Sequence, residues 1–61
     1  MIKEGDKVRT PHGTGTVIFI ERVCDKHPRY GVKHDIQPKG FTDKILYYFL
    51  DEIEKNNSPN T

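Results

Sequence analysis

The sequence predicts an all-β fold, a small barrel of five strands with a short 3₁₀ turn before the last strand. Three observations favour this fold class. Two short strands are joined by a glycine-rich corner, a later stretch alternates apolar and polar residues, and a dense apolar and aromatic run follows near the C-terminus.

The corner lies within residues 5–20 and predicts an immediate reversal of the chain. Val8 and Thr10 stand on alternate positions of the expected first strand. Pro11 removes one ladder donor just before the turn, and Gly13 and Gly15 can adopt positive φ or let two backbones approach closely. The first two strands should therefore form a hairpin.

Residues 17–23 are the longest apolar segment and predict the second strand. Strict alternation places Val17 and Ile20 on opposite faces, so a β-bulge or a strong twist is needed to bury both. Residues 24–28 have the composition of a turn. Residues 29–34 then alternate again and predict a third strand with Tyr30 and Val32 directed inward.

The second half of the chain predicts a loop, a strand, a turn and a last short strand. Residues 35–43 are polar and contain Pro38 and Gly40, so we expect an exposed loop. Residues 44–49 suit a fourth strand partly covered on both faces. Residues 50–55 predict a 3₁₀ turn and a final strand centred on Ile53 that pairs with the first strand. Residues 1–55 thus form the domain and residues 56–61 a disordered tail.

The length of 61 residues allows one domain with a small core. A chain of this size buries only about 60% of the surface that its unfolded form exposes, so each core side chain matters. Tyr47 and Tyr48 are adjacent in a strand, so one should be buried and the other at least partly exposed. The expected core residues are Val8, Val17, Ile20, Tyr30, Val32 and Ile45.

The charge balance argues against a dedicated nucleic-acid binder. Ten Lys and Arg residues stand against nine Asp and Glu residues, a net charge of +1. Cys24 is the single cysteine, so no intramolecular disulfide can form. The sequence shows no signal peptide and no apolar run long enough to span a bilayer, and we expect a cytoplasmic monomer.

A metal site and a catalytic cysteine were both considered for this chain, and we predict neither. Cys24, His27, His34 and Asp35 could hold a metal ion, but one Cys-x-x-His pair without a matching second pair is common by chance. Cys24 with a histidine base lacks a third orienting group, and so small a domain offers little concave volume. We therefore expect no metal, no cofactor and no enzymatic activity.

Two segments carry a resemblance to a known family. Residues 4–8 followed by 11–17, with the His-Gly-Thr-Gly corner, resemble the opening of the Tudor-like RNA-polymerase-interacting domain of CarD-type transcription regulators and transcription-repair coupling factors. Residues 43–48 and 51–53 are similar to the last two strands of that domain. The C-terminal Tudor-like module of UvrD-type helicases is nearly as similar. The resemblance implies a five-stranded SH3-like (Tudor-like) barrel and contact with RNA polymerase.

The resulting hypothesis is a small binding module that docks on RNA polymerase or associated nucleic-acid machinery by adding an edge strand to a partner sheet. Either the first strand or its neighbouring strand would supply the main-chain groups. His12 is expected to be a turn residue that hydrogen-bonds its own backbone and not a catalytic base. The predicted partner-binding residues are Val8, Arg9, Thr10, His12 and, as the exposed aromatic anchor, Tyr48.

Two alternatives from other classes remain open. The first is a weak nucleic-acid binder, whose affinity would fall steeply with salt. Its predicted contacts are Arg22, Arg29, Lys33 and Lys39. The second is a phage-encoded or mobile-element inhibitor that binds one host or defence protein through the loop of residues 35–43.

Overall fold

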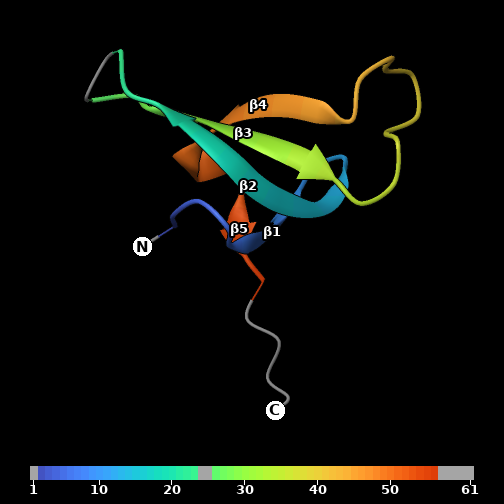
Figure 1. Ribbon diagram of the computed structural model, residues 1–61, viewed down its shortest axis with the longest axis horizontal. Helices are drawn as coiled ribbons and strands as arrows, with labels where there is room; N and C mark the ends of the chain where they lie inside the picture. The colour runs from blue at the N-terminus through green and yellow to red at the C-terminus, as the bar shows by residue number, and fades with distance from the viewer. Residues whose placement is uncertain (1, 24–25, 57–61) are drawn as a thin grey trace.

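The computed structural model describes residues 2–23 and 26–56, which form one antiparallel sheet and one short 3₁₀ turn (Figure 1). The elements are β1 (Lys7–Thr10), β2 (Gly13–Glu21), β3 (Arg29–His34), β4 (Ile45–Phe49), η1 (Leu50–Glu52) and β5 (Glu54–Lys55). The sheet order is β4-β3-β2-β1-β5. The predictions of an all-β fold, five strands and a 3₁₀ turn before the last strand are confirmed.

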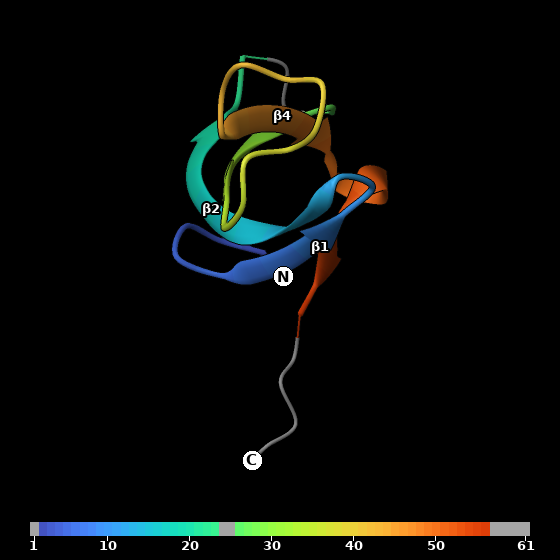
Figure 2. The same ribbon diagram turned by 90° about the vertical axis from the view of Figure 1, so that its right-hand side faces the viewer.

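The sheet curls strongly around its core. Figure 2 shows β2 forming the bend, with β4 on one side of the curl and β1 on the other. In the described part of the chain, β4 and β5 stand at the two ends of the strand order and do not pair with each other. The sheet is therefore curved but not closed, and β4 is one of its edges.

The corner between β1 and β2 depends on two glycines for different reasons. Gly13 has φ of 116°, a backbone conformation that L side chains rarely adopt. Gly15 pairs with His34, and a Cβ added at Gly15 would lie 2.6 Å from the Lys33 carbonyl oxygen and 2.7 Å from Val32. The predicted hairpin therefore needs one glycine for its turn and the other for the close approach of β2 to β3.

A bulge in β2 resolves the conflict between its two apolar faces. Val17 pairs with Val32 but Phe19 pairs with Gly31, so the register shifts by one residue at Ile18. Ile20 then lies opposite Tyr30 and packs against the core while remaining partly buried. Of the two alternatives that the sequence left open, a β-bulge or a strong twist, the structure shows the bulge.

The core lies inside the curl. The buried apolar side chains are Ile2, Val8, Val17, Tyr30, Val32, Tyr48 and Ile53, with Ile20 and Leu46 packed against them. The prediction that Ile45 belongs to the core is wrong, because its side chain lies on the outer face and is 38% exposed. Leu46 and Tyr48 are the residues of β4 that point inward.

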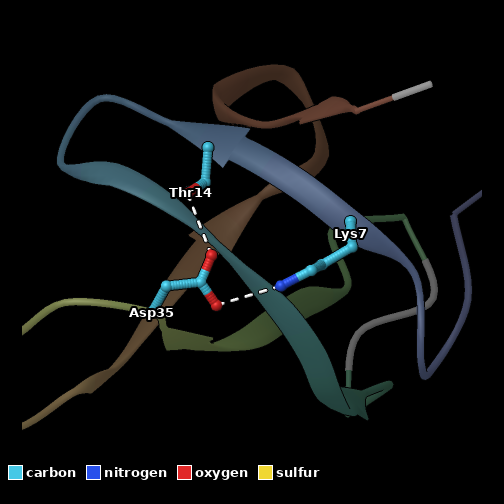
Figure 3. Close-up of polar contacts among 3 residues, drawn as sticks. All are labelled: Lys7, Thr14 and Asp35. Atoms are coloured by element: carbon cyan, nitrogen blue, oxygen red, sulfur yellow. Dashed lines mark hydrogen bonds and ion pairs between the residues drawn. The ribbon is translucent and has the colours of Figure 1, made fainter. Parts of the chain in front are cut away.

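A polar cluster ties the loop after β3 to the first hairpin (Figure 3). The Asp35 carboxylate accepts hydrogen bonds from Lys7 Nζ and from Thr14 Oγ1, each at 3.0 Å. These two bonds, led by that from Lys7, hold the pKa of Asp35 below its ordinary value. The loop also donates the Asp35 N–H to the Thr14 carbonyl, so its first residue is fixed against β2.

The two ends of the domain are held against the sheet. The Gly5 N–H donates to the Val17 carbonyl at 2.7 Å, and the Asn56 N–H donates to the Lys7 carbonyl at 2.8 Å. Pairing with β1 therefore extends to Asn56, which was predicted to begin the tail, and residues 57–61 lie outside the described residues. In the described ranges no helix is long and apolar enough to cross a membrane.

Candidate functional site

The outer face of β4 is apolar and open to solvent. Because side chains alternate along a strand, Ile45, Tyr47 and Phe49 share the face that points away from the core. Their exposed fractions are 38%, 53% and 47%. Three large apolar side chains in a row on one exposed strand of so small a domain form an unusual surface, since such groups are normally buried.

A fourth side chain extends this surface across the sheet. Phe19 on β2 and Tyr47 on β4 both lie opposite Gly31, the central residue between them on β3. A Cβ at Gly31 would lie 3.1 Å from the Tyr47 ring and 3.5 Å from Phe19, so both side chains cover the glycine. We call Phe19, Ile45, Tyr47 and Phe49 the aromatic face.

A shallow depression continues the aromatic face past the end of β4. Its volume is about 470 Å³, and it is lined by Lys26, His27, Pro28, Phe49, Leu50 and Asp51. The His27 ring meets the Phe49 ring edge-on with centroids 6.5 Å apart. Leu50 is 52% exposed, so the apolar surface runs from the middle of the sheet to η1.

The edge of β4 carries main-chain groups that no described residue pairs. The His34 N–H donates to the Lys44 carbonyl, so the even-numbered residues of this segment turn their main-chain groups toward β3. The odd-numbered residues Ile45 and Tyr47 therefore direct N–H and C=O groups away from the sheet. At Phe49 the outward N–H donates to the Glu52 carboxylate at 2.8 Å. The open edge thus comprises Ile45 and Tyr47.

Charged groups of both signs border the aromatic face. Arg29 lies beside Tyr47, with its guanidinium 6.0 Å from the ring centroid, and donates through Nε to Glu21 at 2.6 Å. Lys33 pairs with Ile45 across the β3–β4 ladder and is exposed. Lys44 and Asp43 line a second hollow with Lys33, Ile45 and Tyr47, and Lys26 lies with Asp51 in the depression beside Phe49. The face is therefore apolar at its centre and has a rim of mixed charge.

Tyr48 is not the exposed anchor that was predicted. It is 4% exposed, and its hydroxyl lies 2.9 Å from Nε2 of the buried His34 and 3.1 Å from Nδ1 of His12. The prediction that one of the two tyrosines is buried and the other exposed is confirmed, but the exposed one is Tyr47. The His12 ring bonds Tyr48 and stacks edge-on against Phe41, instead of bonding its own backbone.

The predicted docking residues of β1 do not form an edge. β1 pairs with β2 on one side and with β5 on the other, and Val8 is fully buried. Arg9 forms an ion pair with Glu54, and the Thr10 hydroxyl donates to the Gly13 carbonyl within the turn. β1 is therefore not an edge, because neighbouring strands already pair its main-chain groups, and of the two predicted docking strands only its neighbour β5 stands at an end of the sheet.

The basic residues proposed for nucleic-acid contact lie in three different parts of the fold. Arg29 and Lys33 share the outer face of β3, whereas Arg22 follows β2 and Lys39 lies in the loop beyond the opposite end of β3. Their positions do not form a continuous basic stripe.

The residues considered as metal ligands do not come together in one site. His34 Nε2 bonds Tyr48, and Asp35 bonds Lys7 and Thr14. Cys24 lies outside the described residues, and within residues 2–23 and 26–56 no three His, Cys, Asp or Glu side chains are grouped to hold a metal ion.

The sequence analysis therefore missed the aromatic face. Alternation predicts that the adjacent tyrosines point to opposite faces of the strand. The prediction that Ile45 is buried then places Tyr47 inside and Tyr48 outside, which is the opposite of the structure. One signal was available: Gly31 sits between two inward residues of β3, so its outer side leaves room for large neighbours on adjacent strands.

Comparison of the chain with protein-family models, with curated proteins and with solved structures finds no match.

Proposed function

We propose that this chain is a non-enzymatic protein-binding module, an SH3-like (Tudor-like) small barrel with an open side, that docks on its partner through the β4 edge and the aromatic face. The observation that carries the proposal is the coincidence of two features on one strand. Ile45 and Tyr47 present unpaired main-chain groups, and the same residues with Phe19 and Phe49 present exposed apolar side chains.

Each feature has a physical role in docking. A partner strand that pairs with β4 gains main-chain hydrogen bonds, and its side chains gain contacts with the aromatic face. Aromatic side chains that are already held in a sheet supply contact area with little loss of conformational entropy, and they dominate many interfaces. Tyr47 lies at the centre of the face and is the expected anchor.

RNA polymerase or associated nucleic-acid machinery is the proposed partner. The support for it is the resemblance of residues 4–8, 11–17, 43–48 and 51–53 to Tudor-like polymerase-interacting domains. A protein partner is favoured over nucleic acid by the charge. The net charge is +1, and Arg29 on the aromatic face is paired with Glu21. The rim of the face is mixed in charge, with Lys33 and Lys44 beside Asp43 and Lys26 beside Asp51, whereas a nucleic-acid platform needs a groove that is basic throughout.

The test is binding of the purified domain to multi-subunit RNA polymerase by calorimetry, with Tyr47→Ala as the variant and Ile36→Ala as its matched control. Both side chains are exposed, at 53% and 80%, but Ile36 lies in the loop after β3. If Tyr47 is the anchor, its truncation should weaken binding by about 2 kcal/mol, or about 30-fold, and the control by less than twofold. The same measurement at 50 and 200 mM salt should change little.

Three results of this experiment would contradict parts of the proposal. Absence of wild-type binding overturns the choice of polymerase as partner. Binding that Tyr47→Ala leaves unchanged overturns the aromatic face as the docking surface. Binding that instead falls steeply with salt and is lost on nuclease treatment favours the nucleic-acid alternative.

A further inference from the structure

We propose that the β4 edge also pairs with the β4 edge of a second copy of this chain, in an antiparallel, two-fold symmetric arrangement centred on Leu46. This inference goes beyond the proposed function and does not depend on it, and because one edge pairs with one strand at a time, the second copy and a partner strand would compete for β4. The sequence analysis predicted a monomer, but it did so without knowledge that β4 is an open edge of the sheet (Figure 1).

The open main-chain groups of β4 are complementary to themselves. Ile45 and Tyr47 face outward and Leu46, between them, turns its main chain toward β3. In an antiparallel pair centred on Leu46, Ile45 of one copy lies opposite Tyr47 of the other, and each such pair exchanges two hydrogen bonds. Four hydrogen bonds result, and the Phe49 N–H can remain on Glu52.

The alternative register centred on Tyr47 fits less well. It would place Ile45 opposite Phe49, so the Phe49 N–H would have to leave the Glu52 carboxylate. It would also place Asp43 opposite Asp51, and like charges directly opposite each other are destabilising. Centring the pair on Leu46 avoids both costs.

Charge complementarity favours a second copy as the occupant of this edge. At the beginning of β4, Lys33 and Lys44 outnumber Asp43. Beyond its end, Asp51 and Glu52 outnumber Lys26, and Arg29 is paired with Glu21. An antiparallel pair brings the basic end of each strand toward the acidic end of the other, whereas a parallel pair would join like ends. The net charge of +1 opposes self-association only weakly.

The apolar side chains also match across the pair. Ile45 would lie beside Tyr47 of the second copy on the outer face, which joins the two aromatic faces into one surface. Strand edges with exposed apolar residues and no charge or proline of their own are those that pair with other chains. Because the contact is a single strand pair, we expect a weak dimer.

Disulfide trapping tests the register. All variants carry Cys24→Ser, and single cysteines are introduced at Leu46, Ile45 and Tyr47. At the centre of the pair, the two Leu46 Cα atoms would be about 4.5 Å apart, within the range that a disulfide spans. The two Ile45 Cα atoms, and likewise those of Tyr47, would be about 8 Å apart, which is too far.

Under mild oxidation Leu46→Cys should therefore form covalent dimers at least tenfold faster than Ile45→Cys or Tyr47→Cys. Trapping that is fastest at Ile45 or Tyr47, or equal at all three positions, overturns the proposed register. A second measurement on the unmodified chain covers the case in which Leu46→Cys does not fold.

Sedimentation velocity of the full wild-type chain should show a sedimentation coefficient that rises between about 10 μM and about 1 mM. Ile45→Pro should abolish the rise, because proline removes an outward N–H without breaking the ladder to β3. Ile45→Ala, the matched control, should keep most of it. A wild-type chain that stays monomeric at about 1 mM, or an Ile45→Pro variant that dimerises like the wild type, overturns the proposal.

Discussion

Replacing Tyr48 with Phe removes one oxygen atom from the most connected polar group inside the domain. That oxygen lies 2.9 Å from His34 Nε2 and 3.1 Å from His12 Nδ1. His34 is 2% exposed, and its Nδ1 has no hydrogen-bond partner among the described residues. Without the hydroxyl, both ring nitrogens of a buried histidine would lack a protein partner.

The expected cost follows from this arrangement. A buried polar group that loses its partner destabilises a protein by about 1–3 kcal/mol. In a domain of this size, each 1 kcal/mol lowers the melting temperature by about 4–8 °C. Tyr48→Phe should therefore lower the free energy of unfolding by about 1–3 kcal/mol and the melting temperature by at least about 4 °C.

Tyr47→Phe is the matched control. It removes the same atom from the neighbouring residue, whose side chain is 53% exposed and whose hydroxyl bonds no described residue. Its effect on the free energy of unfolding should stay within about 0.5 kcal/mol. Urea and thermal unfolding of the three proteins measure the difference, and a Tyr48→Phe protein as stable as Tyr47→Phe would refute the assigned role of the hydroxyl.

Three further predictions concern the corner, the polar cluster and β1. Gly15→Ala should destabilise the domain by about 1–3 kcal/mol in urea unfolding, because its Cβ would meet the Lys33 carbonyl oxygen; an unchanged midpoint contradicts the close approach of β2 to β3. Asp35 has a lowered pKa, so its stabilisation is full above its ordinary value of 3.8 and is lost as pH falls through the folded value. The melting-temperature difference between wild type and Asp35→Asn should therefore be larger at pH 7 than at pH 3, and a constant difference contradicts the bonding of its carboxylate. Arg9→Ala should change stability by less than about 1 kcal/mol, because its ion pair with Glu54 is exposed, and it should leave partner binding unchanged in calorimetry.

The strand pattern could be predicted from the sequence because local chemistry determines it. Gly13 requires a turn, Tyr30 and Val32 alternate within a short segment, and the conflict between Val17 and Ile20 requires a bulge. These features depend on the backbone preferences of a few neighbouring residues. The positions of β1, β3 and η1 followed from them within a residue or two.

The orientation of β4 could not be predicted in the same way. Every residue from Ile45 to Leu50 is apolar or aromatic, so alternation gives no contrast between the two faces. A shift of one residue exchanges the faces completely. What decides the phase is contact between distant segments: the Tyr48 hydroxyl meets His12 and His34, and the Tyr47 ring covers Gly31.

The same contacts give the two tyrosines different roles, Tyr48 in the core and Tyr47 on the outer face. Tyr48 has partners for its hydroxyl inside the curl, so burial costs it little, and its ring fills the core. Tyr47 on the other face packs over Gly31 and leaves half of its surface to solvent. Under the proposed function, partner binding depends on Tyr47, whereas folding depends on the hydroxyl of Tyr48. Tyr48→Phe should thus lower the free energy of unfolding while leaving the affinity of the folded domain for its partner unchanged. Tyr47→Ala should weaken the affinity for the partner and have the smaller effect on the free energy of unfolding.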